Sequence, residues 1–175
     1  MARRLPATFL LLFAWNALAQ SADSSSQEPA AVVELGGAAS RSLNQKESSY
    51  GADFAVEVTP IDDWLELELG TTPLFAPHSI EWDTGLLFKK PWTLSPKAEF
   101  MFGVGPEWIR IKSYGVTTNS LGGEAALDFM FWPSAKHKIG WYLEPGYDYS
   151  FARVHDRSIG ITAGLLIAIP KRRHQ

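Results

Sequence analysis

The acidic side chains are the residues of this sequence whose type and spacing could do chemistry. The chain of 175 residues contains 19 Asp and Glu and has a formal net charge of -3. Glu66 and Glu68 are two residues apart, and a glycosidase needs a pair of carboxyl groups. Two acids at this spacing are also neighbours on one face of a β-strand. Because nothing around them implies a cleft, we interpret them as part of a polar strand face.

Two further segments combine the side chains that a nucleophile, a base and an orienting acid require. These are His78-Ser79 with Glu81, and His155-Asp156 with Ser158.

Metal and cofactor motifs are not recognised in the sequence. The four histidines lie in predicted turns, loops or the tail without metal-ligand spacing: His78, His137, His155 and His174. The absence of cysteine excludes thiolate nucleophiles and cysteine-based metal sites. Gly103-Val104-Gly105 and Gly122-Gly123 fall inside strand patterns without a following helix, so they are not phosphate loops. We therefore predict no catalytic, cofactor-binding or metal-binding residues and no cofactor.

The elements that position these side chains are predicted to be β-strands. From Ala31 onward apolar residues recur at every second position, as where Leu65, Leu67 and Leu69 alternate with Glu66 and Glu68. Turn residues divide the pattern into eight segments, each near or above the roughly 9 to 11 residues that a tilted strand needs to cross a bilayer. The segments are 31–40, 49–59, 63–71, 79–90, 97–111, 118–132, 138–151 and 157–169. The proline-containing stretches 59–62, 90–96 and 133–137 are predicted turns at one end. The connections 41–48 and 112–117 lie at the other.

The polar face of these strands consists of glycine, alanine and acids, which suits the interior of a narrow barrel better than a water-exposed surface. Lys89, Lys97 and Lys138 are the expected basic partners of the inward acids. Thirteen acids are expected to point inward: Glu34, Asp53, Glu57, Glu66, Glu68, Glu81, Asp83, Glu99, Glu107, Glu124, Asp128, Glu144 and Asp148. They could form either a cation-attracting interior or, as we favour, a structural plug of hydrogen bonds.

The tryptophans are expected in two groups at the strand ends. Trp64, Trp92, Trp132 and Trp141 fall near one set of turns, whereas Trp82 and Trp108 fall near the opposite rim. Two aromatic girdles flanking an apolar band are typical of a membrane barrel, because amphipathic rings settle at the depth of the lipid headgroups. The apolar face is therefore expected to point outward.

The N-terminal residues predict export. Arg3 and Arg4 precede an apolar stretch and the sequence Ala17-Leu18-Ala19, which together form the pattern of a cleaved signal peptide over residues 1–19. Residues 20–30 are expected to be a disordered lead-in, 31–170 the β-barrel, and 171–175 a basic tail. The pI near 5.8 gives no basic footprint for nucleic acid.

The segments Phe100-Met101-Phe102-Gly103-Val104-Gly105-Pro106-Glu107 and Ala163-Gly164-Leu165-Leu166-Ile167-Ala168 resemble those of the small outer-membrane β-barrel family, the OmpA-type eight-stranded transmembrane domain and its relatives. The resemblance covers about residues 31–170. It implies an all-β, eight-stranded antiparallel up-and-down barrel in the outer membrane. It also implies outer-membrane lipids, the barrel assembly machinery and periplasmic chaperones as partners.

We expect a structural or surface-interaction role without catalysis. One alternative is a soluble exported periplasmic barrel that binds a small apolar ligand in its core. Another follows from the resemblance, because some small outer-membrane barrels modify lipid A. The two His, Ser and acid sets would lie near the outer rim, where that chemistry takes place.

Overall fold

The computed structural model describes residues 29–134, 136–153 and 155–171, and these form an all-β fold. Eight strands of 12 to 17 residues follow one another along the chain. They are β1 (Ala31–Ser42), β2 (Ser48–Ile61), β3 (Leu65–Ala76), β4 (Ser79–Ser95), β5 (Ala98–Ser113), β6 (Val116–Phe131), β7 (Ile139–Ser150) and β8 (Arg157–Ile169). No helix among these residues is long and apolar enough to cross a membrane.

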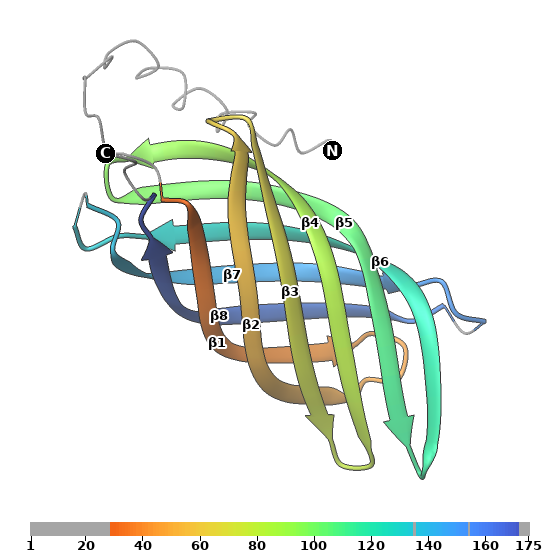
Figure 1. Ribbon diagram of the computed structural model, residues 1–175. Coiled ribbons are helices and arrows are strands. Elements are labelled where there is room, and N and C mark those ends of the chain that lie inside the picture. Colours follow the sequence, from red (N-terminus) through yellow and green to blue (C-terminus); the bar gives the residue numbers. More distant parts are fainter. Residues whose placement is uncertain (1–28, 135, 154, 172–175) are drawn as a thin grey trace, which may run out of the picture.

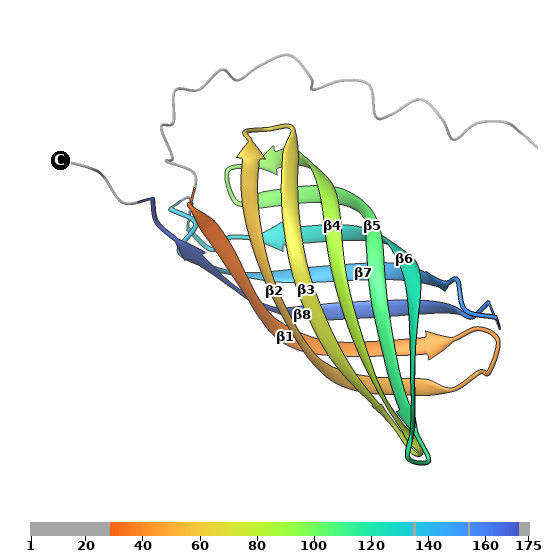
Figure 2. The same cartoon turned by 45° about the vertical axis from the view of Figure 1, so that its right-hand side comes forward.

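Each strand pairs antiparallel with its neighbours in the sequence, and the pairing of β1 with β8 closes the sheet into a barrel. Figure 1 and Figure 2 show the start of β1 beside the end of β8, so both ends of the described chain lie at one end of the barrel. We call this the terminal end and the opposite one the far end. The predicted up-and-down barrel of eight strands is confirmed.

Several strands extend beyond their predicted limits through proline. The predicted turn at 90–96 was wrong over much of its length, because β4 continues to Ser95 and pairs Pro91 with Met101. β2 likewise passes Pro60, with a bulge between Val58 and Ile61. Proline removes one backbone donor, but Pro91 keeps its place in the ladder with β5, and Pro60 falls within the bulge of β2. Stacking of Trp92 on Phe100 at 5.5 Å adds to the pairing beyond Pro91.

The connections at the far end are short. Between β5 and β6 only Tyr114 and Gly115 form the turn, with φ angles of 49° and 80°. Two successive positive φ angles are characteristic of a tight hairpin turn, and glycine adopts this conformation without strain. The far end therefore carries compact turns, the longest of which joins β7 to β8.

The barrel exterior is apolar. Outward residues such as Phe54, Leu69, Phe88 and Leu165 are 45 to 60% exposed. Such a continuous apolar surface is unusual for a soluble monomer, whose largest exposed apolar patch covers roughly 300 to 600 Å². The prediction that the apolar face points outward is confirmed.

Five of the six tryptophans of the barrel form the expected girdles. Trp64, Trp92 and Trp141 are exposed at the terminal end, and Trp82 and Trp108 are exposed toward the far end. Trp132 does not belong to a girdle, because its side chain is only 2% exposed and lies in the interior cluster described below.

The predicted signal peptide and most of the predicted lead-in and tail lie outside the described residues. Ala30 N–H donates a hydrogen bond to the carbonyl of Ile169 at 2.7 Å, so backbone pairing begins one residue before β1.

Candidate functional site

The thirteen acids expected to point inward all lie on the interior face of the barrel, where each is buried or half-buried. They come from β1 to β7 and face one another across the lumen. The lumen, with its carboxylates, is therefore the candidate functional site.

Lys89 on β4 is the centre of the half of the lumen near the terminal end. Its ammonium group is completely buried and forms ion pairs with Glu68, with Asp128 at 3.0 Å and with Glu144 at 2.7 Å. These acids come from β3, β6 and β7, so one side chain connects four strands across the barrel. A buried charge is tolerated only when paired in this way. Removing Lys89 would leave three buried carboxylates without their common partner.

A glycine makes room for this lysine. Gly103 is paired with Lys89 in the ladder between β4 and β5. A Cβ atom at position 103 would come within 2.8 Å of Lys89 Cγ, which is closer than real Cβ contacts. The glycine on the inward face of β5 thus allows the lysine stem to cross the lumen.

Apolar packing closes the terminal end beside the lysine network. Trp132 stacks on His137 with ring centroids 4.9 Å apart, and His137 Nδ1 lies 3.8 Å from Glu99 Oε1. The buried cluster consists of Val32, Met101, Met130, Trp132, Tyr142 and Leu166. The interior is therefore filled by side chains at this end, as expected for a barrel of eight strands.

Asp53 lies in the middle of the lumen, and two hydroxyl groups donate hydrogen bonds to its carboxylate. The Tyr142 hydroxyl donates to Asp53 Oδ2 at 2.5 Å, and the Thr72 hydroxyl donates to Oδ1 at 2.8 Å. Gly36 lies against the same tyrosine, because a Cβ there would approach the Tyr142 hydroxyl to 2.4 Å. Both carboxylate oxygens of Asp53 therefore have a hydrogen-bond donor.

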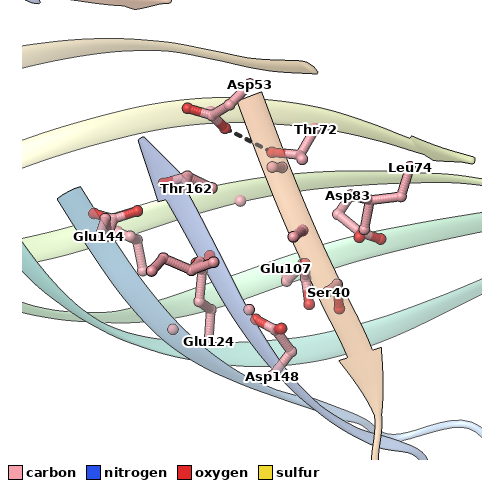
Figure 3. Close-up of a pocket in the computed structure, with 18 of the residues that line it drawn as sticks. Ser40, Asp53, Thr72, Leu74, Asp83, Glu107, Glu124, Glu144, Asp148 and Thr162 are labelled. Carbon is pink, nitrogen blue, oxygen red and sulfur yellow. Dashed lines mark hydrogen bonds between the residues drawn. The ribbon is translucent and has the colours of Figure 1, made fainter. Parts of the chain in front are cut away.

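The lumen beyond Asp53, toward the far end, differs in composition. Asp83, Glu107, Glu124 and Asp148 project into it from β4, β5, β6 and β7 (Figure 3). Ligand oxygens of Glu107, Glu124 and Asp148 all lie within 4.8 Å of one another. We call Asp83, Glu107, Glu124 and Asp148 the far acidic cluster. No lysine or arginine among the described residues forms an ion pair with these four acids.

The far acidic cluster surrounds a cavity of about 70 Å³. Glycines on the neighbouring strands leave space for the carboxylates, because a Cβ at Gly85 would lie 3.0 Å from Glu124 Oε2. Ser158 donates a hydrogen bond of 3.0 Å to Asp148 Oδ2. Glu107 is 5% exposed, and its Oε2 has no hydrogen-bond partner within the described part of the chain.

A wider vestibule of about 540 Å³ continues from this cavity to the far end. Both spaces are lined by Asp83, Glu107 and Asp148, so they meet at the acids. The vestibule is rich in hydroxyl groups, since its lining includes Ser40, Ser42, Ser48, Ser49, Ser79, Ser113, Ser120, Ser150 and Ser158. The far acidic cluster is thus reached from the far end of the barrel.

The two candidate catalytic sets are not assembled as nucleophile and base in the described residues. His78 stacks on Tyr114 at 5.6 Å, and His155 stacks on Tyr149 at 5.7 Å. The Ser158 hydroxyl donates to an acid, Asp148, and not to a histidine.

Asp156 accepts hydrogen bonds from the Ser42 hydroxyl at 3.0 and 3.2 Å. Glu68 of the candidate glycosidase pair belongs to the Lys89 network.

Only one of the three expected basic partners lies in the lumen. Lys89 forms the predicted ion pairs, but the prediction for Lys97 and Lys138 was wrong, because both are exposed. Lys97 precedes β5 and Lys138 precedes β7, so each lies in a turn. The inward and outward alternation of a strand does not extend to turn residues.

Among the lumen residues that sequence reasoning missed are Thr72, Trp132 and Tyr142. A signal for Trp132 was available, since it continues the series Glu124, Ala126, Asp128 and Met130 at every second position. Tyr142 similarly alternates between Gly140 and Glu144.

Comparisons with known proteins show which solved structures share this fold. No protein-family model matches the chain, and no curated protein matches its sequence. Neisserial surface protein A aligns with a TM-score of 0.64 and 14% identity over 79% of this chain and 96% of its own. The N-terminal β-barrel domain of OprF from Pseudomonas aeruginosa aligns with a TM-score of 0.55 and 14% identity over 81% of this chain and 100% of its own.

A third structure is that of Ail, the attachment invasion locus protein of Yersinia pestis, in complex with the heparin analogue sucrose octasulfate. It has a TM-score of 0.50 and 13% identity over 80% of this chain and 99% of its own. Identities this low show a shared fold alone. The predicted resemblance is confirmed at that level: the chain has the fold of the small eight-stranded β-barrels of the outer membrane.

Proposed function

We propose that this protein is an integral outer-membrane barrel with a structural or surface-interaction role and without catalysis. The observation that carries the proposal is the combination of an apolar exterior with a lumen closed at the terminal end. The exterior requires a lipid environment. Because the lumen is closed at the terminal end, we favour a structural role or a surface interaction at the exposed end over transport through the barrel.

The apolar exterior supports insertion because its girdles have the right spacing along a single strand. On β4 the outward residues between Trp82 and Trp92 are Thr84, Leu86, Phe88 and Lys90. At about 3.3 Å per residue, and allowing for the tilt of the strand, the ten steps along the chain from Trp82 to Trp92 cover roughly the apolar band of about 25 Å expected for an outer-membrane barrel. Outer-membrane lipids are the proposed partners of this surface.

The lumen argues against the alternative of a soluble barrel for a small apolar ligand. Such a ligand needs a mostly apolar pocket with few polar groups. The cavity of about 70 Å³ is instead lined by seven carboxylates: Asp53, Glu68, Asp83, Glu107, Glu124, Glu144 and Asp148. Burying an apolar molecule against them would desolvate charged groups without pairing them.

The surface-interaction role is supported by the far end. In the outer-membrane orientation, with the termini in the periplasm, the compact turns and the hydroxyl-rich vestibule face the outside. Arg41, Arg110, Lys112 and Arg157 are exposed near the same rim, where they suit contact with anionic headgroups or an anionic partner. Catalysis has no comparable support, because the His, Ser and acid sets are not assembled.

Cell fractionation tests the proposal. We expect the full chain in the outer-membrane fraction, with unheated samples migrating differently from boiled ones on a gel because an intact membrane barrel resists unfolding. Protease added to whole cells should reach the far-end turn between β1 and β2, residues 43–47, more readily than the two-residue turn between β5 and β6. Recovery in the soluble periplasm after osmotic shock, without detergent, would contradict membrane insertion.

A conductance measurement in planar bilayers tests the closed lumen. We expect no sustained single-channel current from the wild-type protein. A steady open channel would favour an ion-conducting function over a structural or surface role.

A further inference from the structure

We propose that the start of β6, at the far end, binds an extended peptide by strand addition. The peptide carries acidic side chains toward the outside of the barrel and basic side chains toward the vestibule. We call residues 116–120, which form the binding surface, the free edge. The inference rests on the surface-interaction role proposed above and deepens it by naming the kind of partner.

The free edge exists because β6 is longer than its neighbour β7. β6 pairs with β5 along its whole length, whereas β7 ends at Ser150, which pairs with Gly122. The chain after β7 turns away from β6 toward β8 (Figure 1), and Phe151 N–H donates a hydrogen bond of 2.8 Å to the Leu121 carbonyl. Within the part of the chain that the structure describes, residues 116–120 therefore have a neighbouring strand on one side only.

The backbone groups of two residues are available for pairing. In an antiparallel strand the N–H and C=O groups of one residue point to the same side, and successive residues point to opposite sides. Because the Leu121 carbonyl points toward the β7 side, Thr117 and Asn119 present their N–H and C=O groups to that side as well. These groups have no backbone partner among the described residues. An extended peptide can pair with such groups as an added strand.

The free edge lacks the features by which proteins protect an exposed strand edge. Such edges are usually blocked by proline, by charged side chains or by bulges. The sequence of residues 116–120 is Val-Thr-Thr-Asn-Ser, which contains no proline and no charge, and this part of β6 pairs with β5 without a register shift. Its β-branched residues favour an extended backbone. The edge is therefore suited to accept a further strand.

The outward face beside the free edge is basic. Asn119 is paired with Arg110 and Thr117 with Lys112, and both basic side chains are exposed. Neighbouring strands lie about 4.8 Å apart, so an outward side chain on an added strand would lie roughly 10 Å from the β5 backbone, within the combined reach of an arginine and a glutamate. Acidic side chains of the peptide are therefore expected on this face.

The inward face beside the free edge is acidic. The vestibule is lined by Thr118 and Ser120 of β6 and by Asp156 after β7, so it borders the free edge. Its acids are Glu47, Glu81, Asp83, Glu107, Asp148 and Asp156, and no lysine or arginine of the described chain lines it. Side chains of an added strand alternate between the two faces. Basic side chains of the peptide are therefore expected toward the vestibule.

The free edge lies outside the apolar band. Leu121 is paired with the girdle residue Trp108, and residues 116–120 continue from there toward the far end. Backbone groups without partners are too costly against hydrocarbon, whereas water hydrates them. In the proposed outer-membrane orientation, a peptide can therefore reach the free edge from outside the cell.

Fluorescence anisotropy of a labelled peptide tests the proposal with the full chain refolded in a zwitterionic detergent. The probe is Glu-Val-Thr-Lys-Glu-Val-Thr-Lys, because an extended chain places its Glu side chains on one face and its Lys side chains on the other. Exchanging the second Glu with the second Lys keeps the composition but mixes the charges on both faces. We expect saturable binding of the first peptide and at least tenfold weaker binding of the exchanged one.

Variants of the protein separate backbone pairing from charge. Asn119→Pro removes an N–H group on the free side and keeps the ladder with β5, so it should weaken binding at least tenfold. Asn119→Ala loses the side chain but keeps the donor, and should bind at least fivefold more tightly than Asn119→Pro. Arg110→Glu should weaken binding at least tenfold. Lys97→Glu, at an exposed position of the terminal end, is its control and should stay within twofold of wild type.

Absence of saturable binding at about 1 mM peptide, or equal affinities of Asn119→Pro and Asn119→Ala, would overturn strand addition. Equal affinities for the two peptides, or of Arg110→Glu and wild type, would overturn the charges assigned to the partner. Heat-modifiable migration verifies folding, and Thr117→Pro, with the same expected loss, replaces Asn119→Pro if that variant does not fold. A barrel that fractionates with the outer membrane but does not bind the peptide would contradict this inference alone.

Discussion

The two halves of the lumen contain similar acids but compensate them differently. Near the terminal end, Lys89 holds Glu68, Asp128 and Glu144 in one network, and Trp132 packs beside it. Toward the far end, the cluster around Glu107 has no base and borders a cavity that widens into the vestibule. The position of a single lysine thus separates acids that are ion-paired from acids that have no basic partner among the described residues.

The largest effect should come from removing that lysine. Lys89→Met should destabilise the barrel by about 3 to 5 kcal/mol, because it leaves buried carboxylates uncompensated. Urea-induced unfolding in lipid vesicles measures the change. Lys112→Met, at an exposed position, is the control and should change stability by less than about 0.5 kcal/mol. A loss below about 1 kcal/mol for Lys89→Met would mean that the two halves do not differ as described.

The same substitution made in each half compares them directly. Glu68→Gln should cost about 1 to 3 kcal/mol, because the buried Lys89 loses an ionic partner. Glu107→Gln should cost less than about 0.5 kcal/mol or stabilise the barrel, because it removes repulsion between like charges. The measured quantity is the difference between the unfolding free energies of the two variants. Equal values would contradict the distinction between the two halves of the lumen.

A smaller loss than that of Lys89→Met is expected in the layer between the halves. Tyr142→Phe should cost about 1 to 2 kcal/mol, because Asp53 loses one of its two buried donors. Tyr147→Phe is the control, since Tyr147 is 40% exposed on the outer face. Equal unfolding free energies for the two variants would show that Asp53 does not need the tyrosine.

Much of this arrangement could be predicted from the sequence because side chains in a strand alternate with a period of two. Once the apolar face was assigned outward, the inward position of all thirteen acids and of Lys89 followed. The same alternation places Trp132 inside, because it follows Asp128 and Met130 at every second position. Its position near a turn led instead to its assignment to a girdle.

Other features depend on partners that are distant in sequence. The bond between Tyr142 and Asp53 joins β7 to β2, and only the closure of the barrel brings them together. The exposure of Lys97 and Lys138 depends on turn geometry, which strand periodicity does not specify. The continuation of β4 through Pro91 depends on pairing with β5 and on the stacking of Trp92 and Phe100.

The central claim is that the apolar face of the barrel lies against lipid, and an arginine placed on that face tests it most directly. Leu69 is an outward residue in the middle of β3, and Leu43 is an outward-exposed leucine in the far-end turn between β1 and β2. In lipid vesicles, Leu69→Arg should lower the free energy of unfolding by about 2 to 4 kcal/mol, as expected near the bilayer midplane, whereas Leu43→Arg should lower it by no more than about 1 kcal/mol. Equal and small effects at both positions would contradict the membrane barrel.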